Sequence, residues 1–106
     1  MRKDNGRITN SKNGVPIRLI EERWSHIIDH HNDIAGYFDD VLNAVEDPDM
    51  ILKGWTGELL AVKKINDRYI IAAYKEISKS DGFIITAFFI SKIEKVKRRG
   101  VIWEKQ

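Results

Sequence analysis

The sequence has no cysteine, only two prolines and no long apolar run. Without cysteine, the chain can form no disulfide and can offer no thiolate to a metal ion. No stretch of about 18 apolar residues is present, and the first residues lack the pattern of a signal peptide. We therefore expect neither a membrane span nor a secretion signal, and a cytoplasmic location fits these absences.

Several common catalytic motifs are missing as well. The sequence has no glycine-rich phosphate loop, no nucleophile elbow and no paired-carboxylate signature. The aromatic motifs of RNA-recognition domains are absent too, because Phe83, Phe88 and Phe89 belong to a run that is typical of a protein core.

The composition that remains is that of one ordinary globular domain. The chain has 106 residues, of which 42% are hydrophobic and 32% charged, enough apolar material for a single core. Residues 1–13 are polar and rich in turn formers, so we expect a flexible segment there and one domain over residues 14–106. Val15 to Ile20 is expected to form a short edge strand, a position where Pro16 is tolerated.

The stretch from Phe83 to Ser91 is apolar, aromatic and β-branched, which predicts a buried central strand. Thr86 interrupts it at the centre. A buried hydroxyl needs a partner, since an unpaired one costs about 1–3 kcal/mol. Thr86 therefore either bonds to a neighbouring backbone group or points into a cleft, and the sequence leaves both open.

Two helices are expected before the strands. Trp24, Ile27, Ile28 and His31 recur at helical spacing, which predicts a helix from Glu21 to about His31. A second helix is expected from Asp33 to Val45, ended by Pro48.

Four strands follow in close order, and the short connections between them predict antiparallel neighbours. We expect them over residues 50–55, 58–65, 68–77 and 83–91, then a short basic helix from Lys92 that Gly100 closes, and a last short strand over residues 101–103. The predicted fold is α+β: two N-terminal helices packed on one face of an antiparallel β-meander of four to five strands, with a short C-terminal basic helix.

The formal net charge is only +2, but the charges are segregated. From Glu21 to Asp49 the single base is Arg23, among many acids, whereas bases outnumber acids in the remainder of the chain. Such segregation indicates either an anion-binding face or charges placed for solubility.

All three histidines lie in the first predicted helix or at its end. His26 and His30 are four residues apart and share a face, so they could bind a divalent metal, although no cysteine or zincin glutamate accompanies them. His31 belongs to the apolar face, where a half-buried structural role is an alternative. Without any metal, a pair of histidines can also supply an acid and a base near neutral pH.

Cations and hydroxyls lie on the predicted strands. Lys63 and Lys64 point to opposite sides of their strand, as do Tyr74 and Lys75 on the next. A sheet face with lysine, tyrosine and Thr86 could hold a phosphodiester, with solvated lysines as the alternative. The C-terminal bases could also contact a phosphate backbone or form a solvated helix face; they include Lys92, Lys95, Arg98 and Arg99.

The residues 17–31, 69–75 and 82–87 together resemble the phage-type nucleases of the barnase–EndoU–colicin–RelE-like (BECR) superfamily. The resemblance rests on the Trp24-Ser25-His26 helix with His31 five residues on, and on the strand Ile84-Ile85-Thr86-Ala87. It covers about residues 17–103. The pattern of the family usually continues histidine-proline-glutamate, where this chain has His31-Asn32-Asp33, and arginine is common in place of His30.

The resemblance implies a metal-independent endoribonuclease without cofactors. Attack of an RNA 2′-hydroxyl on the adjacent phosphorus would give a cyclic phosphate and a free 5′-hydroxyl. By the resemblance, His26 and His31 match the helix histidines, and the polar strand positions are Lys63, Tyr74, Lys75 and Thr86. It further implies a toxin of a toxin–antitoxin or phage-conflict system with a small acidic antitoxin as partner. The alternative function is a module that binds RNA or protein on the same basic face without cleaving.

Overall fold

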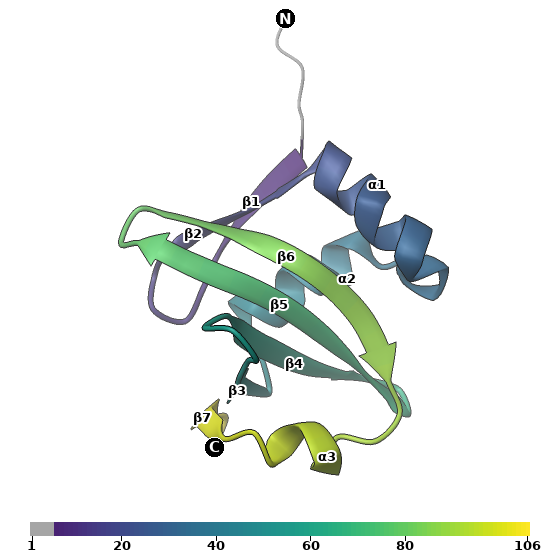
Figure 1. Ribbon diagram of the computed structural model, residues 1–106, viewed down its shortest axis with the longest axis vertical. Helices are drawn as coiled ribbons and strands as arrows, with labels where there is room; N and C mark the ends of the chain where they lie inside the picture. Colours follow the sequence, from purple (N-terminus) through teal and green to yellow (C-terminus); the bar gives the residue numbers. More distant parts are fainter. Residues whose placement is uncertain (1–5) are drawn as a thin grey trace, which may run out of the picture.

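The protein is built on one seven-stranded mixed sheet, seen in Figure 1. The computed structural model describes residues 6–106. The strands lie in the order β1-β2-β6-β5-β4-β3-β7. Their bounds are Gly6–Asn10 for β1, Pro16–Ile20 for β2, Met50–Lys53 for β3, Leu59–Ile65 for β4, Arg68–Ser78 for β5, Asp81–Ile90 for β6 and Val101–Glu104 for β7.

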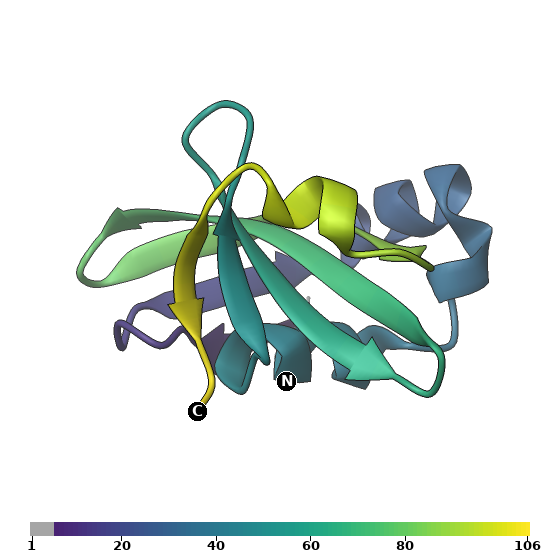
Figure 2. The same ribbon diagram turned by 90° about the horizontal axis from the view of Figure 1, so that it is seen from below.

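Three α-helices and one 3₁₀ turn surround the sheet. They are α1 (Glu21–His30), η1 (Asn32–Ile34), α2 (Phe38–Glu46) and α3 (Glu94–Lys97). Seen edge-on in Figure 2, α2 lies on one side of the sheet and α3 on the other, while α1 sits beside the sheet. Among the described residues, no helix is long and apolar enough to cross a membrane.

The predicted fold is wrong in its architecture. The sheet is a seven-stranded mixed sheet and not a four- to five-stranded antiparallel meander, and the first two helices do not share one face. The sheet extends beyond β3–β6 by the β1–β2 hairpin on one side and by β7 on the other; of these three strands, β1 was not predicted. β2 is also internal, not an edge strand, because it pairs with β1 antiparallel and with β6 in parallel.

The β1–β2 hairpin shows why the hydropathy pattern did not predict β1 as a strand. In β1 the apolar Ile8 is 64% exposed whereas the polar Thr9 is buried, so hydropathy gives no strand signal. The turn is closed by hydrogen bonds from the Ser11 amide to the Val15 carbonyl and from the Gly14 amide to the Ser11 carbonyl, and Gly14 has a φ of +80°. The predicted flexible segment, residues 1–13, thus includes β1, while residues 1–5 lie outside the described part.

The predicted second helix is also divided. The backbone turns through η1, then passes Ala35, Gly36 and Tyr37 before α2 begins at Phe38. Strands β3–β6 begin and end within two residues of the predicted bounds, and β4 and β5 are joined by the predicted two-residue Asn66-Asp67 hairpin, in which Asn66 has a φ of +57°.

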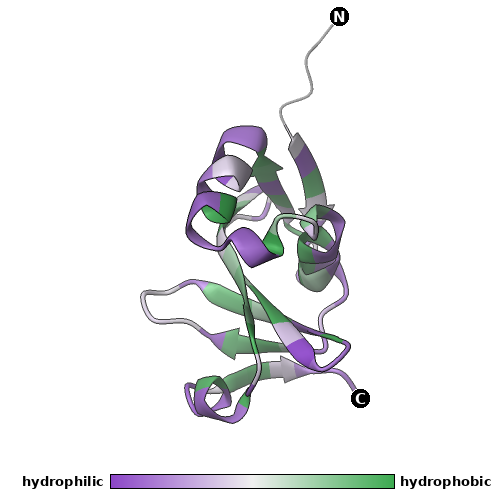
Figure 3. Cartoon of the chain, turned by 90° about the vertical axis from the view of Figure 1, so that its right-hand side faces the viewer, coloured by the Kyte–Doolittle hydropathy of each residue, from purple (hydrophilic) through white to green (hydrophobic). Residues whose placement is uncertain are grey.

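Two apolar clusters cover the two faces of the sheet. The larger one joins α1 and α2 to β2, β4, β5 and β6, with Ile17, Val41, Ile70 and Ile84 fully or almost fully buried. The smaller one lies on the opposite face, where Ile93 and Val96 of the α3 segment cover residues of β3, β4 and β5. In Figure 3 the strands carry mostly hydrophobic residues, and hydrophilic ones cover much of the helix surfaces. We name the two sides of the sheet the α2 face and the α3 face.

Candidate active site

The candidate site lies where the sheet opens between β2 and β6. These two strands pair at only two positions, Ile17 with Gly82 and Arg18 with Phe83. β2 then ends at Ile20 and α1 starts at the next residue, so the helix leaves alongside the unpaired part of β6. β6 bends at this point, because its register with β5 shifts between Ala73 and Tyr74 and leaves Ile85 as an extra residue.

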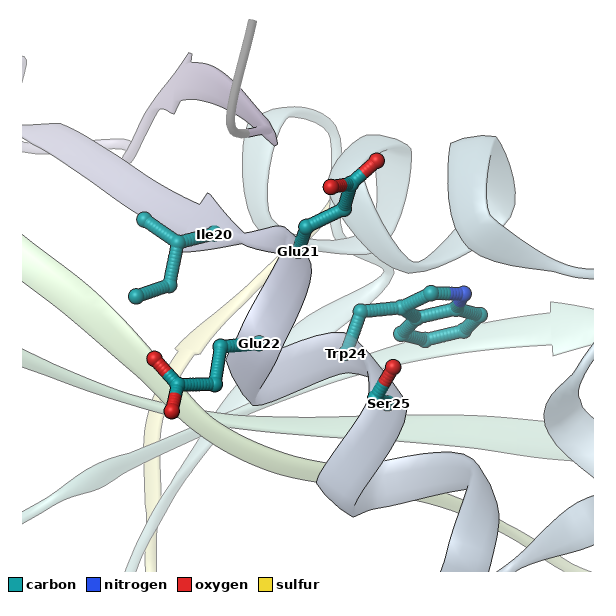
Figure 4. A pocket seen from close by; sticks show the side chains of 5 residues that line it. All are labelled: Ile20, Glu21, Glu22, Trp24 and Ser25. Atoms are coloured by element: carbon teal, nitrogen blue, oxygen red, sulfur yellow. The ribbon is translucent and has the colours of Figure 1, made fainter.

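Open hollows surround the start of α1. One, of about 380 Å³, is lined by Ile20, Glu22, Arg23 and His26. A second, of about 280 Å³, shares Ile20 and Arg23 and is completed by Arg18, Phe83 and Ile84. In Figure 4, Ile20 and Glu22 point to one side of the helix start, whereas Glu21 and Trp24 point to the other. The side with Ile20 and Glu22 is the one that meets β6.

Arg23 connects the helix to the bend in β6. Its Nη1 donates a hydrogen bond to the Ile85 carbonyl at 3.5 Å, and the side chain is half-buried. The guanidinium therefore lies beside the residue that precedes Thr86. Because guanidinium carries several N–H donors in a planar fork, the remaining ones are free to meet an anionic group in the hollow.

The histidines follow Arg23 along α1. His26 is three residues on and His30 seven, so the three side chains share one stripe of the helix. The His26 and His30 rings are exposed and their centroids are 4.6 Å apart, and His30 Nδ1 lies 3.1 Å from the His26 carbonyl oxygen. In the part of the chain that the structure describes, no group of three histidine, cysteine or acidic residues could hold a metal ion.

His31 contacts Phe88, which stands on the same face of β6 as Thr86. The His31 ring is half-buried, with its centroid 5.6 Å from that of Phe88. Thr86 pairs with Ala73 and Phe88 with Ile71, so both side chains stand on the α3 face. Thr86 is partly exposed, and its hydroxyl makes no hydrogen bond to the described residues. Of the two roles that the sequence left open, the hydrogen bond to a neighbouring backbone group is thus not found among the described residues.

A basic row crosses the same face next to Thr86. Arg18 of β2, Phe83 of β6 and Lys75 of β5 are aligned by strand pairing, so their side chains stand side by side. Lys75 is exposed and makes no ion pair with the described residues, while Arg18 Nη2 lies 2.9 Å from Asp81 Oδ1. The row thus places two cationic side chains on either side of the Phe83 ring, an arrangement that suits an anionic ligand.

Lys63 does not join this group. It pairs with Ile70 on the α2 face, where its Nζ donates hydrogen bonds to the Asp47 carbonyl at 2.7 Å and to Asp47 Oδ2 at 3.1 Å. Lys105 holds the other carboxylate oxygen at 3.1 Å. Hydrogen bonds from Lys105 and Lys63, and their charges, lower the pKa of Asp47. Lys63 thus fastens the end of α2 to β4.

Tyr74 lies on the α2 face as well. Its side chain is fully buried in the larger cluster, and its hydroxyl finds no hydrogen-bond partner among the described residues. Burial, together with the charge of Glu76, raises the pKa of Tyr74 above its usual range. The structure therefore separates Lys63 and Tyr74 from the histidines. Lys75 and Thr86 lie on the α3 face, whereas His26 lines the hollow with Arg23 and His31 packs against Phe88.

The predicted C-terminal bases lie on the α3 face. Lys92, Lys95 and Arg98 are exposed, and the helix is shorter than predicted, with four residues. Arg99 instead packs on Trp55, with its guanidinium carbon 5.0 Å from the ring centroid, and donates hydrogen bonds to the carbonyls of Lys53 and Gly54.

The loop that carries Trp55 is held in shape by Glu58. The Glu58 carboxylate accepts hydrogen bonds from the Thr56 amide and hydroxyl, both at 2.8 Å. Hydrogen bonds from the backbone N–H of Glu58 itself and then from that of Thr56 lower the pKa of Glu58 to about 2, with smaller contributions from the Thr56 hydroxyl and the Trp55 N–H. Gly54 has to be glycine, since a Cβ there would lie 2.4 Å from the Glu58 carbonyl oxygen.

Glu58→Gln is expected to lower the free energy of unfolding by about 1–2 kcal/mol at neutral pH, because a charge-assisted hydrogen bond is lost. The folded-state pKa of Glu58, about 2, lies below its ordinary value of 4.5. The stabilisation is therefore complete above pH 4.5 and disappears as the pH falls toward 2. Urea unfolding between these limits should show the variant and the wild type converging in acid. Exposed Glu46, replaced by glutamine, is the control; an equal loss there would contradict the role of Glu58.

Comparison with known proteins identifies the class of molecule. The family model described as phage-Barnase-EndoU-ColicinE5/D-RelE like nuclease 2 matches residues 1–104. The chain therefore belongs to this family of nucleases, as the resemblance of its helix and central strand implies. Neither a curated protein nor a solved structure matches the chain.

Three features of this region were not predicted as parts of a site: Arg18, Arg23 and Trp55. The sequence did hold an indication for Arg23, because it is the one lysine or arginine in an acidic stretch and stands one helical turn before His26. The sequence held no indication for the other two: the position of Arg18 depends on the pairing of β2 with β6, and that of Trp55 on its contact with Arg99.

Proposed function

We propose that this nuclease is a metal-independent endoribonuclease that cleaves by transesterification. The observation that carries the proposal is the meeting of α1 with the bend of β6. There Arg23 and His26 line one hollow, Arg23 contacts Ile85, and His31 packs on Phe88 beside Thr86 on the same face. Two imidazoles, two cations and a free hydroxyl are the groups that the reaction needs.

In the proposed reaction the RNA 2′-oxygen forms a bond to phosphorus while the bond from phosphorus to the 5′-oxygen breaks. One histidine in its neutral form accepts the 2′-hydroxyl proton, and the other, protonated, donates a proton to the leaving 5′-oxygen. The products are a 2′,3′-cyclic phosphate and a 5′-hydroxyl. Arg23 and Lys75 stabilise the charge on the phosphoryl oxygens, and Thr86 orients the phosphate by a hydrogen bond.

The proposal is tested by incubating the purified protein with total RNA in excess chelator. We expect cleavage whose products carry 2′,3′-cyclic phosphate ends. DNA should stay intact, because it has no 2′-hydroxyl. Loss of activity in chelator, restored by a divalent cation, would contradict the metal-independent mechanism and favour a metal site at His26 and His30 instead.

A second candidate is a module that binds RNA or a protein without cleaving it, favoured by the exposed bases of the α3 face. It predicts salt-sensitive RNA binding and no product after long incubation.

We also propose that the nuclease is a toxin. Its expression in the cytoplasm would then arrest growth, and a small acidic partner protein would restore growth. The acidic partner would cover the basic row of Arg18 and Lys75.

A further inference from the structure

Trp55 is presented to solvent in a way that core packing does not explain. Its side chain is 54% exposed, at the tip of the loop between β3 and β4. In Figure 2 this loop stands out from the same side of the sheet as α3, opposite α2. The loop that carries Trp55 therefore lies on the side that carries Thr86 and Lys75.

The ring is held in place before any ligand arrives. The Arg99 guanidinium lies 5.0 Å from the Trp55 ring centroid and is fixed by hydrogen bonds to the carbonyls of Lys53 and Gly54. Glu58 closes the loop from within through Thr56. A preorganised aromatic side chain loses little conformational freedom when it binds a ligand.

The loop also lies next to the basic row. Leu59, the first residue of β4 after the loop, pairs with Tyr74, and Lys75 is the next residue of β5. From there the row continues through Phe83 to Arg18, at the opening between β2 and β6. A path over the α3 face thus leads from Trp55 past two cations and a second aromatic ring to the hollow of Arg23 and His26.

We propose that Trp55, backed by Arg99, is a base-stacking subsite that holds the single-stranded RNA substrate away from the cleaved bond. The inference rests on the proposed function, since it takes RNA as the substrate. Aromatic rings that alternate with cations along a groove are how proteins bind single strands: bases stack on the rings and phosphates meet the cations. The basic side chains around Trp55, those of Arg98 and Arg99 among them, favour a polyanionic ligand over an apolar protein segment.

Binding can be separated from cleavage with a short labelled strand of 2′-O-methyl RNA, which has no free 2′-hydroxyl to react. By fluorescence anisotropy at fixed salt, Trp55→Ala is expected to weaken binding about 10-fold, since stacking of one base is lost. Trp55→Tyr should restore binding to within about 2-fold of wild type because a tyrosine ring also stacks. The matched control is Trp103→Ala. Trp103 lies on the edge strand β7, where it pairs with Ile51 on the α2 face and has Lys12 over its ring, so it stands away from the basic row.

The outcomes are distinct. Weakened binding in Trp55→Ala, rescue by tyrosine and an unchanged Trp103→Ala support the subsite. Unchanged affinity in Trp55→Ala overturns it, even where the wild type cleaves RNA, so the proposed function is then judged by the chelator experiment alone. If the wild type cleaves nothing but Trp55→Ala weakens binding, the subsite stands and the cleavage mechanism fails. Loss of binding to a partner protein, with RNA affinity unchanged, overturns the subsite and makes Trp55 a protein contact.

Discussion

Alanine at His26 or at His31 is expected to lower the rate of RNA cleavage about 100-fold or more, because general acid–base catalysis contributes about that factor for each proton transferred. Both residues stand at the meeting of α1 and β6, one in the hollow with Arg23 and one on Phe88. Cleavage of total RNA under single-turnover conditions measures the effect. The double variant should be little slower than the worse single one, since acid and base act in one step.

His30→Ala is the matched control. His30 is exposed on the same helix and its ring touches that of His26, but it makes no hydrogen bond, ion pair or ring contact with β6 among the described residues. We expect it to keep most of the activity. Since His31 is half-buried, the thermal stability of each variant has to be measured beside its rate. Unchanged cleavage in both single variants and the double would remove the histidines from the mechanism.

Gly82→Ala is expected to destabilise the fold by about 3 kcal/mol or more, because it forces overpacking against backbone. A Cβ at Gly82 would lie 2.5 Å from the Lys75 carbonyl oxygen and 2.6 Å from Ile17 Cδ1. Gly82 is the point where β2, β5 and β6 are joined, since it pairs with Ile17 and with Glu76. Equilibrium unfolding in urea measures the loss.

Gly36→Ala provides the comparison. Nothing lies within 4 Å of a Cβ at that position, and Gly36 has no positive φ. We expect this variant to be neutral or slightly more stable, because alanine restricts the unfolded chain more than glycine does. Equal stability of Gly82→Ala and Gly36→Ala would show that the close approach at Gly82 relaxes at no cost.

The parts of the fold that could be predicted are those fixed by local pattern. Helix α1 and strands β4, β5 and β6 follow from apolar spacing and from turns such as Asn66-Asp67. The topology could not be predicted, because it depends on which edges pair. Nothing in the polar β1 indicates that it extends the sheet, and nothing in β2 shows that its far side meets β6 in parallel.

The candidate site divides in the same way. His26, His31, Lys75 and Thr86 were singled out by residue type and resemblance; Lys75 and Thr86 lie on the α3 face, His31 contacts Phe88 of the same strand as Thr86, and His26 lines the hollow with Arg23. Lys63 and Tyr74 stand on the other face, because side-chain alternation leaves the choice of face to the register. Arg23 and Trp55 become visible only once the bend of β6 and the contact of Arg99 are known.

The contact between Arg23 and Ile85 spans 62 positions of the sequence. During synthesis on the ribosome, α1 emerges long before the strand against which it must lie. A nascent chain that ends before β6 therefore carries its histidines without the strand that completes the proposed site. The site that we propose can therefore form only once most of the polypeptide has been made.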